Sequence, residues 1–239
     1  MSKGEDRVAT AFAEVAEEAF ATARLAATAA LAGLADEPEP TSAMVAQVEA
    51  AVRPALERRA VQGAGFVAAP GLLADHEWWL EWFVTRADAV VERLQVQTEP
   101  AALGFYDYRS YAWYRVPHDS GRPHVTGPYV DHMCTEDYAL TFSMPVLRGQ
   151  TDIDADIDAD IDFVGIAGVD VSLASMERRL LPHLRAEPGR VAVVNDERRV
   201  VVSNSAALMC GTRADADELA AAHSRTALAD LPIEIVRWG

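Results

Sequence analysis

The sequence predicts an α+β fold, in which an antiparallel sheet is flanked by helices and preceded by one long N-terminal helix. Residues 5–34 are rich in alanine, glutamate and leucine, which favours a long helix, and Gly33 with the proline-containing residues 36–40 ends it. From Gly63 onward, short apolar runs are separated by glycine and proline, which is typical of strands. Because these runs follow one another with few helical segments between them, an antiparallel sheet is favoured over alternating βαβ units.

Most elements can be assigned from their local pattern. Thr41 and Ser42 are typical helix caps, and a second helix is expected to reach about residue 60. Strands are expected over residues 65–69, 77–85, 90–96, 125–131, 138–147, 163–171, 191–203 and 233–238, with a hairpin turn at residues 195–197 in the seventh run. Ser172 is expected to cap a further helix over residues 172–184.

Size and charge narrow the class of protein. The chain has 239 residues, half of them hydrophobic, which is enough for one large domain. Its formal net charge of −16 would repel nucleic acid and anionic membrane surfaces, so neither is expected as a partner. Two cysteines are too few for a disulfide framework. Residues 1–7 carry charges of both signs, unlike a signal peptide, and the apolar residues 26–35 fall short of the ~20 that a membrane span needs. These features predict a cytoplasmic protein.

Aromatic side chains and carboxylates concentrate between residues 105 and 170. This region contains Tyr106, Tyr111, Trp113 and Tyr114, then Tyr129 and Asp131 with Val130 between them, and finally Asp170 at the end of an apolar run. Aromatic rings supply apolar area and a negative π-face, and carboxylates supply charge, which together suit a small cation or amine. Composition alone favours a simpler interpretation, an aromatic core with surface aspartates.

The spacing of these residues resembles the ligand site of Cache domains, the PAS-like sensor modules of bacterial receptors. Amino-acid-binding members of that family carry a tyrosine, four residues, an arginine, one residue, Trp-Tyr, a later Tyr-x-Asp and a distal aspartate. Here four residues separate Tyr106 from Tyr111, which takes the place of the arginine, and Trp113-Tyr114 follow. Tyr129, Asp131 and Asp170 match the remaining positions, so that the resemblance covers about residues 63–203 and the N-terminal helix.

The resemblance implies a sensor without catalytic activity or cofactor. Residues 1–60 would be a helical segment that packs on the sensor or dimerises it, and residues 61–239 would be the ligand-binding domain. A small amine, amino acid or small organic acid would lie between the sheet and the aromatic loop, and the signal would pass to a separate protein. In the family the arginine grips the ligand's carboxylate, and Tyr111 offers only a neutral hydroxyl, which shifts the expected preference toward amines.

Two other classes of function stay open at this point. One is an enzyme that uses Asp131 or Asp170 as general base and a histidine as acid, although no spacing specifies a nucleophile. The other is an interaction module that dimerises through the first helix and binds no small molecule.

Neither candidate for a metal site matches a known pattern. Residues 152–162 repeat aspartate like the start of an EF-hand loop, but Ile157 and Phe163 occupy the positions that need glycine and glutamate. This segment is therefore expected to be a solvated acidic hairpin tip. His118, His124, His132 and Cys134 fit no standard zinc spacing, so that no bound metal is expected.

Overall fold

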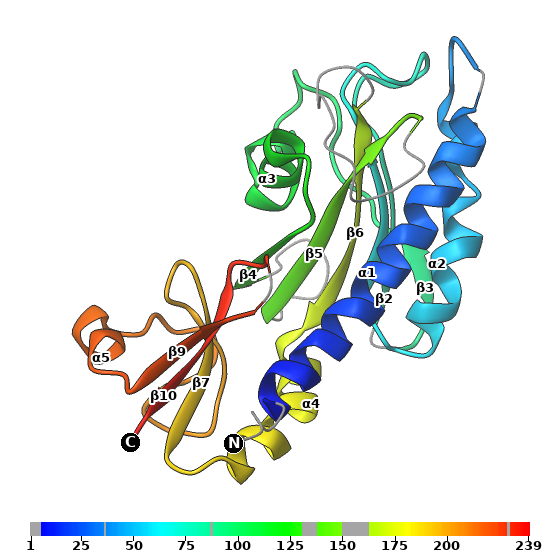
Figure 1. The fold of residues 1–239 in the computed structure, drawn as a ribbon. Helices are drawn as coiled ribbons and strands as arrows, with labels where there is room; N and C mark the ends of the chain where they lie inside the picture. The colour runs from blue at the N-terminus through cyan, green and yellow to red at the C-terminus, as the bar shows by residue number, and fades with distance from the viewer. Residues whose placement is uncertain (1–5, 36, 87, 131–137, 150–162, 229) are drawn as a thin grey trace.

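The computed structural model describes residues 6–35, 37–86, 88–130, 138–149, 163–228 and 230–239 (Figure 1). The helices are α1 (Arg7–Leu34), α2 (Val48–Glu57), α3 (Ala112–Ser120), α4 (Leu173–Ala186) and α5 (Ala216–Ala220), with short 3-10 helices η1 (Ser42–Val45) and η2 (Tyr108–Ser110). The strands are β1 (Gly63–Ala68), β2 (Leu80–Thr85), β3 (Val91–Arg93), β4 (His124–Val130), β5 (Tyr138–Leu147), β6 (Phe163–Ser172), β7 (Arg190–Asn195), β8 (Val200–Ser203), β9 (Ser224–Ala227) and β10 (Ile233–Trp238).

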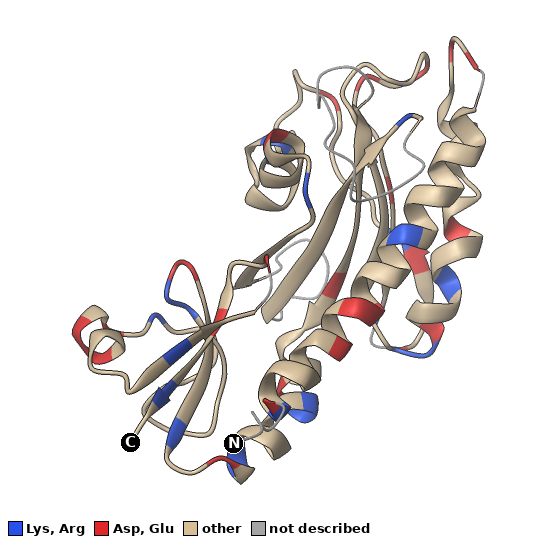
Figure 2. Ribbon diagram, viewed as in Figure 1, with Lys and Arg blue, Asp and Glu red and all other residues tan. Residues whose placement is uncertain are grey.

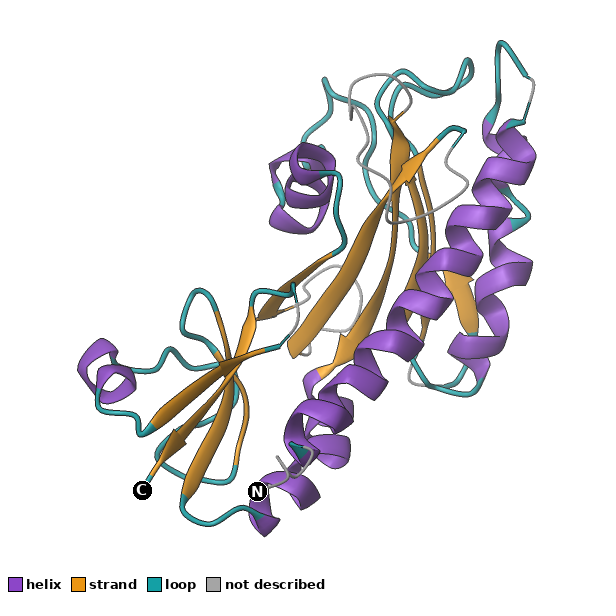
Figure 3. Ribbon diagram, in the orientation of Figure 1, coloured by secondary structure: helices purple, strands orange, loops and turns teal. Residues whose placement is uncertain are grey.

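The strands form two antiparallel sheets. The larger has the order β3-β2-β1-β6-β5-β4, and the smaller has the order β8-β7-β10-β9. In the larger sheet the long hairpin β5–β6 lies at the centre, where its register pairs Thr141 with Asp170 and Ser143 with Gly168. Helices α1 and α2 lie along one face of this sheet, and α3 lies on the opposite side (Figure 3). The predicted α+β fold with an antiparallel sheet and a long N-terminal helix is confirmed.

The first helix covers the larger sheet because its buried face is built mainly from small residues. Asp6 caps the helix by accepting hydrogen bonds from the backbone of Val8 and Ala9. Seven buried alanines let the helix approach the strands closely, and they are Ala11, Ala16, Ala19, Ala23, Ala26, Ala27 and Ala30. Phe12 and Phe20 supply the bulk, with ring centroids 6.5 and 5.5 Å from that of Phe142 on β5. This face of the sheet is therefore a continuous apolar core.

The opposite face of the sheet is covered by an aromatic layer. Trp78, Trp82, Tyr108, Trp113 and Tyr114 are all buried there, packed with Leu80, Val84, Leu94, Val67 and Ile166. Tyr108 is fully buried, and its hydroxyl donates a 2.7 Å hydrogen bond to the carbonyl of Ala68 at the end of β1. This bond fixes the segment before α3 onto the sheet.

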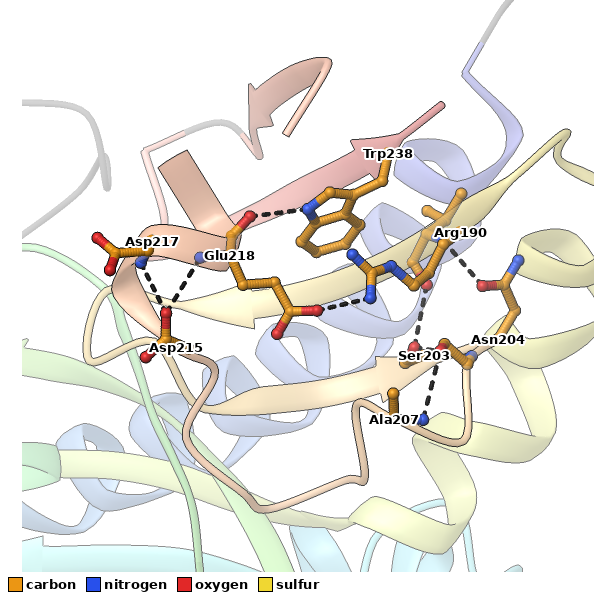
Figure 4. A network of polar contacts seen from close by, with 10 residues as sticks. Arg190, Ser203, Asn204, Ala207, Asp215, Asp217, Glu218 and Trp238 are labelled. Atoms are coloured by element: carbon orange, nitrogen blue, oxygen red, sulfur yellow. Dashed lines mark hydrogen bonds and ion pairs between the residues drawn. The ribbon is translucent and has the colours of Figure 1, made fainter. Parts of the chain in front are cut away.

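The smaller sheet has its own polar support, which Figure 4 shows. Asp215 caps α5 by accepting hydrogen bonds from the backbone of Asp217 and Glu218. Arg190 on β7 donates to the Glu218 carboxylate at 2.6 Å, and its guanidinium lies 4.5 Å from the ring centroid of Trp238. The indole of Trp238 donates to the Glu218 carbonyl at 2.8 Å. These contacts hold α5 against the strands β7 and β10.

Buried or half-buried polar side chains join the smaller sheet to the rest of the molecule. Asn195, at the end of β7, donates from its amide to the carbonyl of Gly127 in β4 at 2.7 Å. Arg237 on β10 binds the carboxylates of Asp6 at 2.8 Å and Glu187 at 3.3 Å. The last strand is thereby tied to the start of α1 and to the end of α4.

Most expected strands form where the sequence places them, but the structure differs from the expectation in several elements. The run over residues 77–85 becomes a strand only from Leu80, and the expected second helix is divided into η1 and α2. The aromatic residues 112–120 form helix α3, whereas a loop was expected. The strands after residue 190 build a second sheet, to which the unexpected β9 adds an edge. The boundary expected between residues 1–60 and 61–239 stays a prediction.

The expected acidic hairpin tip, residues 152–162, lies outside the described residues. Within the described parts of the chain, no helix is long and apolar enough to cross a membrane.

We predict that Tyr108→Phe lowers the free energy of unfolding by about 1–2 kcal/mol, because it removes a hydrogen bond between two buried groups without changing the ring's volume. Urea denaturation should show a lower midpoint with an unchanged slope. Tyr138→Phe is the matched control, since that ring is exposed, and it should change the midpoint little. Equal midpoints for Tyr108→Phe and the natural protein would contradict the role assigned to this bond.

Candidate functional site

The centre of the larger sheet has one polar stripe, on the face opposite α1. Side chains alternate along β5, so that Leu140, Phe142 and Met144 face the helices while Thr141 and Ser143 face the aromatic layer. The register continues this stripe across the neighbouring strands. Opposite Thr141 lie Thr126 and Asp170, and opposite Ser143 lie His124 and Gly168. Figure 2 shows that the strands of the larger sheet carry few charged residues, which makes a buried carboxylate there unusual.

That carboxylate belongs to Asp170, whose exposed fraction is 4%; Glu81 on β2 is a second buried carboxylate of this sheet. The hydroxyl of Thr141 lies 2.6 Å from Asp170 Oδ1, and the hydroxyl of Tyr129 contacts the same Thr141 oxygen. Because a carboxylate only accepts, Thr141 donates to Asp170 and accepts from Tyr129. Tyr129 and Asp170, two of the residues expected at the site, are thus joined through a residue that the sequence analysis did not single out.

Two glycines make room for the side chain that covers this carboxylate. A Cβ placed on Gly63 would lie 2.7 Å from Asp170 Oδ2 and 2.8 Å from the indole nitrogen of Trp82. A Cβ placed on Gly168 would lie 3.3 Å from the far edge of the same indole. The ring of Trp82 therefore lies across β1 and β6 with its nitrogen near Asp170, and any side chain larger than hydrogen at Gly63 would push the two groups apart.

A row of rings leads from Trp82 to the surface. The centroids of Trp82 and Trp113 are 6.5 Å apart, those of Trp113 and Tyr111 are 6.3 Å apart, and those of Tyr111 and Tyr106 are 5.1 Å apart. Trp82 and Trp113 are buried, whereas Tyr111 is 45% exposed. The planes of Tyr111 and Trp113 are nearly parallel, at 22°. The row thus connects solvent with the neighbourhood of the buried carboxylate.

Tyr114 lies deeper in the aromatic layer than the site prediction implied. Its ring packs against Tyr108, Phe163 and His118, with centroids 5.1, 6.0 and 6.1 Å away. Burial raises the pKa of Tyr114 well above its usual range and keeps the phenol neutral. For Tyr114 and for Trp113, the interpretation as aromatic core holds alongside the site interpretation, because both rings contribute to packing.

The nearest arginine of the aromatic segment is already engaged. Arg109 donates from Nε and Nη2 to the two carboxylate oxygens of Asp107 at 3.0 and 3.1 Å, and its guanidinium lies 4.4 Å from the ring centroid of Trp78. The hydrogen bond from Arg109 lowers the pKa of Asp107 below its usual value. To take the role of the arginine that the resembled family has at the position of Tyr111, Arg109 would have to leave Asp107 and Trp78.

The histidines divide between the site and the surface. His124 faces the polar stripe beside Ser143, and burial lowers its pKa, although Asp196 opposes the shift. His118 is half exposed and contacts Asp119. Among the residues that the structure describes, no group of three histidines, cysteines or carboxylates could hold a metal. His132 and Cys134 lie outside the described residues, as does Asp131, the third of the residues expected to hold an amine.

The structure thus brings together five of the expected site residues along one path, Tyr106 and Tyr111 near the surface, Trp113 below them, and Asp170 with Tyr129 at the sheet. The sequence analysis missed Trp82, Thr141, Ser143 and Thr126. One signal could have found two of them, because Thr141 and Ser143 are polar residues that alternate with apolar ones in an otherwise buried strand.

The comparisons with known proteins agree with this geometry at the level of the fold. No protein-family model and no curated protein matches the chain by sequence. Solved structures match over almost its whole length. A protein named methyl-accepting chemotaxis protein X is 16% identical, with a TM-score of 0.61, covering 96% of this chain and 91% of its own. The ligand-binding domain of the Pseudomonas aeruginosa PAO1 amino-acid chemoreceptor PctC, in complex with GABA, is 17% identical, with a TM-score of 0.52 and the same coverage.

A third structure is the extracellular domain of mmHK1S-Z3, designated a histidine kinase. It is 14% identical, with a TM-score of 0.59, covering 95% of this chain and 93% of its own. The chain has the fold of Cache-type sensor domains. The resemblance inferred from the aromatic motif is confirmed at that level.

The expectation of a cytoplasmic protein is wrong. Structural neighbours of this chain are extracellular domains of designated histidine kinases and ligand-binding domains of chemoreceptors, which points to an extracellular or periplasmic setting. The expectation rested on the mixed charges of residues 1–7 and on the short apolar run, and neither feature reports on the compartment in which a folded domain works.

We predict that Thr141→Val and Tyr129→Phe are coupled in their effect on stability, because both remove parts of one hydrogen-bonded chain that ends on Asp170. In a double-mutant cycle measured by urea denaturation, the effects should depart from additivity by about 0.5–3 kcal/mol. Thr141→Val combined with Thr85→Val is the control, since the Thr85 hydroxyl bonds the Leu56 carbonyl. If the effects of Thr141→Val and Tyr129→Phe were as additive as those of the control pair, the hydrogen bonds from Tyr129 through Thr141 to Asp170 would not be coupled.

Proposed function

We propose that the protein is a sensor domain that binds a small amine or amino compound between the larger sheet and the aromatic layer, and that it passes the signal to a separate partner. The observation that carries this proposal is the buried Asp170, held by Thr141 and Tyr129 beneath a row of aromatic rings. A carboxylate in an apolar setting favours a cationic group as its ligand partner, since a charge-assisted hydrogen bond is strong there.

The fold supports a sensor and gives no independent support to catalysis. Similar structures are a ligand-binding domain of a chemoreceptor and an extracellular domain of a designated histidine kinase. An enzyme would need an acid and a base facing a common substrate. His124 and Asp170 both face the polar stripe, but they stand in different rows, opposite Ser143 and Thr141. The proposed activity is therefore binding without turnover.

The chemistry around Tyr111 supports an amine in preference to an ordinary amino acid. Tyr111 presents a half-exposed neutral ring where the resembled family has an arginine, and Arg109 is held by Asp107. PctC, a structural neighbour, is described in complex with GABA, which carries an ammonium group and also a carboxylate three methylenes away, so it supports only the ammonium half of this proposal. A ligand bound here would have its ammonium near Asp170 and its chain along the rings of Trp82 and Trp113.

Asp170→Asn should abolish binding of amines while the fold is retained, because the amide keeps the shape of the side chain but loses its charge. Isothermal titration with n-butylamine is the measurement, and circular dichroism monitors the fold. Asp75→Asn is the matched control. The exposed Asp75 carboxylate accepts hydrogen bonds from the backbone and hydroxyl of Ser42 and is not part of the proposed site. Unchanged affinity in Asp170→Asn would remove this residue from the site.

Tyr111→Arg should shift the preference from amines toward amino acids, because the guanidinium can bind a carboxylate through two hydrogen bonds. The pair L-norvaline and n-butylamine differs only in the α-carboxylate. The natural protein should bind n-butylamine more tightly than L-norvaline. Compared with the natural protein, Tyr111→Arg should shift the ratio of the two affinities toward L-norvaline by roughly a hundredfold. A natural protein that prefers L-norvaline would show that another group holds the carboxylate.

A further inference from the structure

Two hydroxyls of the polar stripe have no hydrogen-bond partner in the part of the chain that the structure describes. Ser143 Oγ and Thr126 Oγ1 are both buried, and neither finds a donor or an acceptor among the described residues. Ser143 as a whole has an exposed fraction of 0%. Leaving a buried hydroxyl unpaired is costly, and native proteins do so rarely. These two hydroxyls lie on the same face of the sheet as Thr141 and Asp170 and next to them in the register. They therefore indicate a site where a polar group of a ligand supplies the hydrogen-bond partner.

The register fixes where these hydroxyls lie relative to the carboxylate. Thr126 is paired with Thr141, which is paired with Asp170, so these three lie in one row across the sheet. Ser143 lies two residues along β5 from Thr141, which is about 6.7 Å in an antiparallel strand. His124 and Gly168 flank Ser143 in this second row. The polar stripe therefore offers a charged end at Asp170 and a neutral end at Ser143.

The indole ring of Trp82, the innermost of the row of rings, lies beside Ser143. The Cβ that Gly168 lacks would lie 3.3 Å from the indole of Trp82 and 3.5 Å from the Cα of Ser143. A ligand whose ammonium lies at Asp170 and whose chain follows Trp82 would bring its far end to the Ser143 row. That row carries the Ser143 hydroxyl and one imidazole, and the Thr126 hydroxyl lies in the neighbouring row. Since burial disfavours the charged form of the imidazole, this end of the stripe suits a neutral polar group better than a carboxylate.

We infer that Ser143 and Thr126 determine specificity for amines that carry a second, neutral polar group, such as amino alcohols, three or four carbons from the nitrogen. This inference rests on the proposed binding of amines at Asp170 and names the ligand class more narrowly. The ligand's hydroxyl takes the place of the missing partner. An amine with a methyl group at the same position leaves the hydroxyls unpaired and binds more weakly.

The test compares 3-amino-1-propanol with n-butylamine, which differ by a hydroxyl in place of a methyl group. In isothermal titration the natural protein should bind the amino alcohol about tenfold more tightly. Ser143→Ala should remove most of this preference by weakening only the amino alcohol, and Thr126→Val provides a second, isosteric variant. Neither variant should lower the urea midpoint appreciably, because the hydroxyls that they remove have no partner among the described residues.

Ser203→Ala is the matched control, since its hydroxyl is engaged with Ser205 and Val191 in the smaller sheet. It should lower the urea midpoint and leave the preference unchanged. Equal affinity of the natural protein for the two amines, or equal weakening of both by Ser143→Ala, would overturn the inference. If Asp170→Asn still abolished binding of both amines in that case, the proposed function would stand without it. If the natural protein bound neither amine, both would fail.

Discussion

The alternation of side chains along β5 and β6 is the constraint on which the rest of the structure depends. In a strand, successive residues face opposite sides, so one apolar set can pack on α1 while the other set faces the aromatic layer. The second set contains Thr141, Ser143 and Asp170, and it is compatible with a core only because each polar group can be bonded locally or by an occupant. A shift of register by one residue would place the carboxylate against the alanines of α1.

Much of the fold could be predicted because local sequence patterns determine it. The first helix, the hairpin β5–β6 and the cap at Ser172 follow from composition, alternation and a single side chain, and Ser172 does accept from the backbone of Ser175. The division into two sheets could not be predicted, since pairing β7 with β10 depends on residues about forty positions apart. Helix α3 was missed because its aromatic residues and Pro117 are weak helix formers, and packing on the sheet decides its conformation.

The site was predictable in part for the same reason. The aromatic motif and the strand-ending Asp170 are visible in the sequence as unusual residue types, and the rings of Tyr111 and Trp113 do lie together. Trp82 was not singled out as a site residue, because its position near Gly63 depends on a contact between two strands. Thr141 and Ser143 are common residues whose role appears only when the register shows which side chains oppose them. Sequence spacing can thus reveal site residues of uncommon types, whereas common types are recognised as site residues only from the pairing of the strands.

The bond from Asn195 to the Gly127 carbonyl has a mechanical consequence. Gly127 belongs to β4, the strand that contributes Tyr129 to the site, and the Asn195 side chain is anchored a second time by the backbone of Arg199. A strand that is held in this way cannot slide alone, because its displacement must carry β7 with it. Since β7 pairs with β10, and Arg237 of β10 grips Asp6, the movement would reach the first turn of α1. The smaller sheet therefore connects β4, the strand that carries Tyr129, with the long helix.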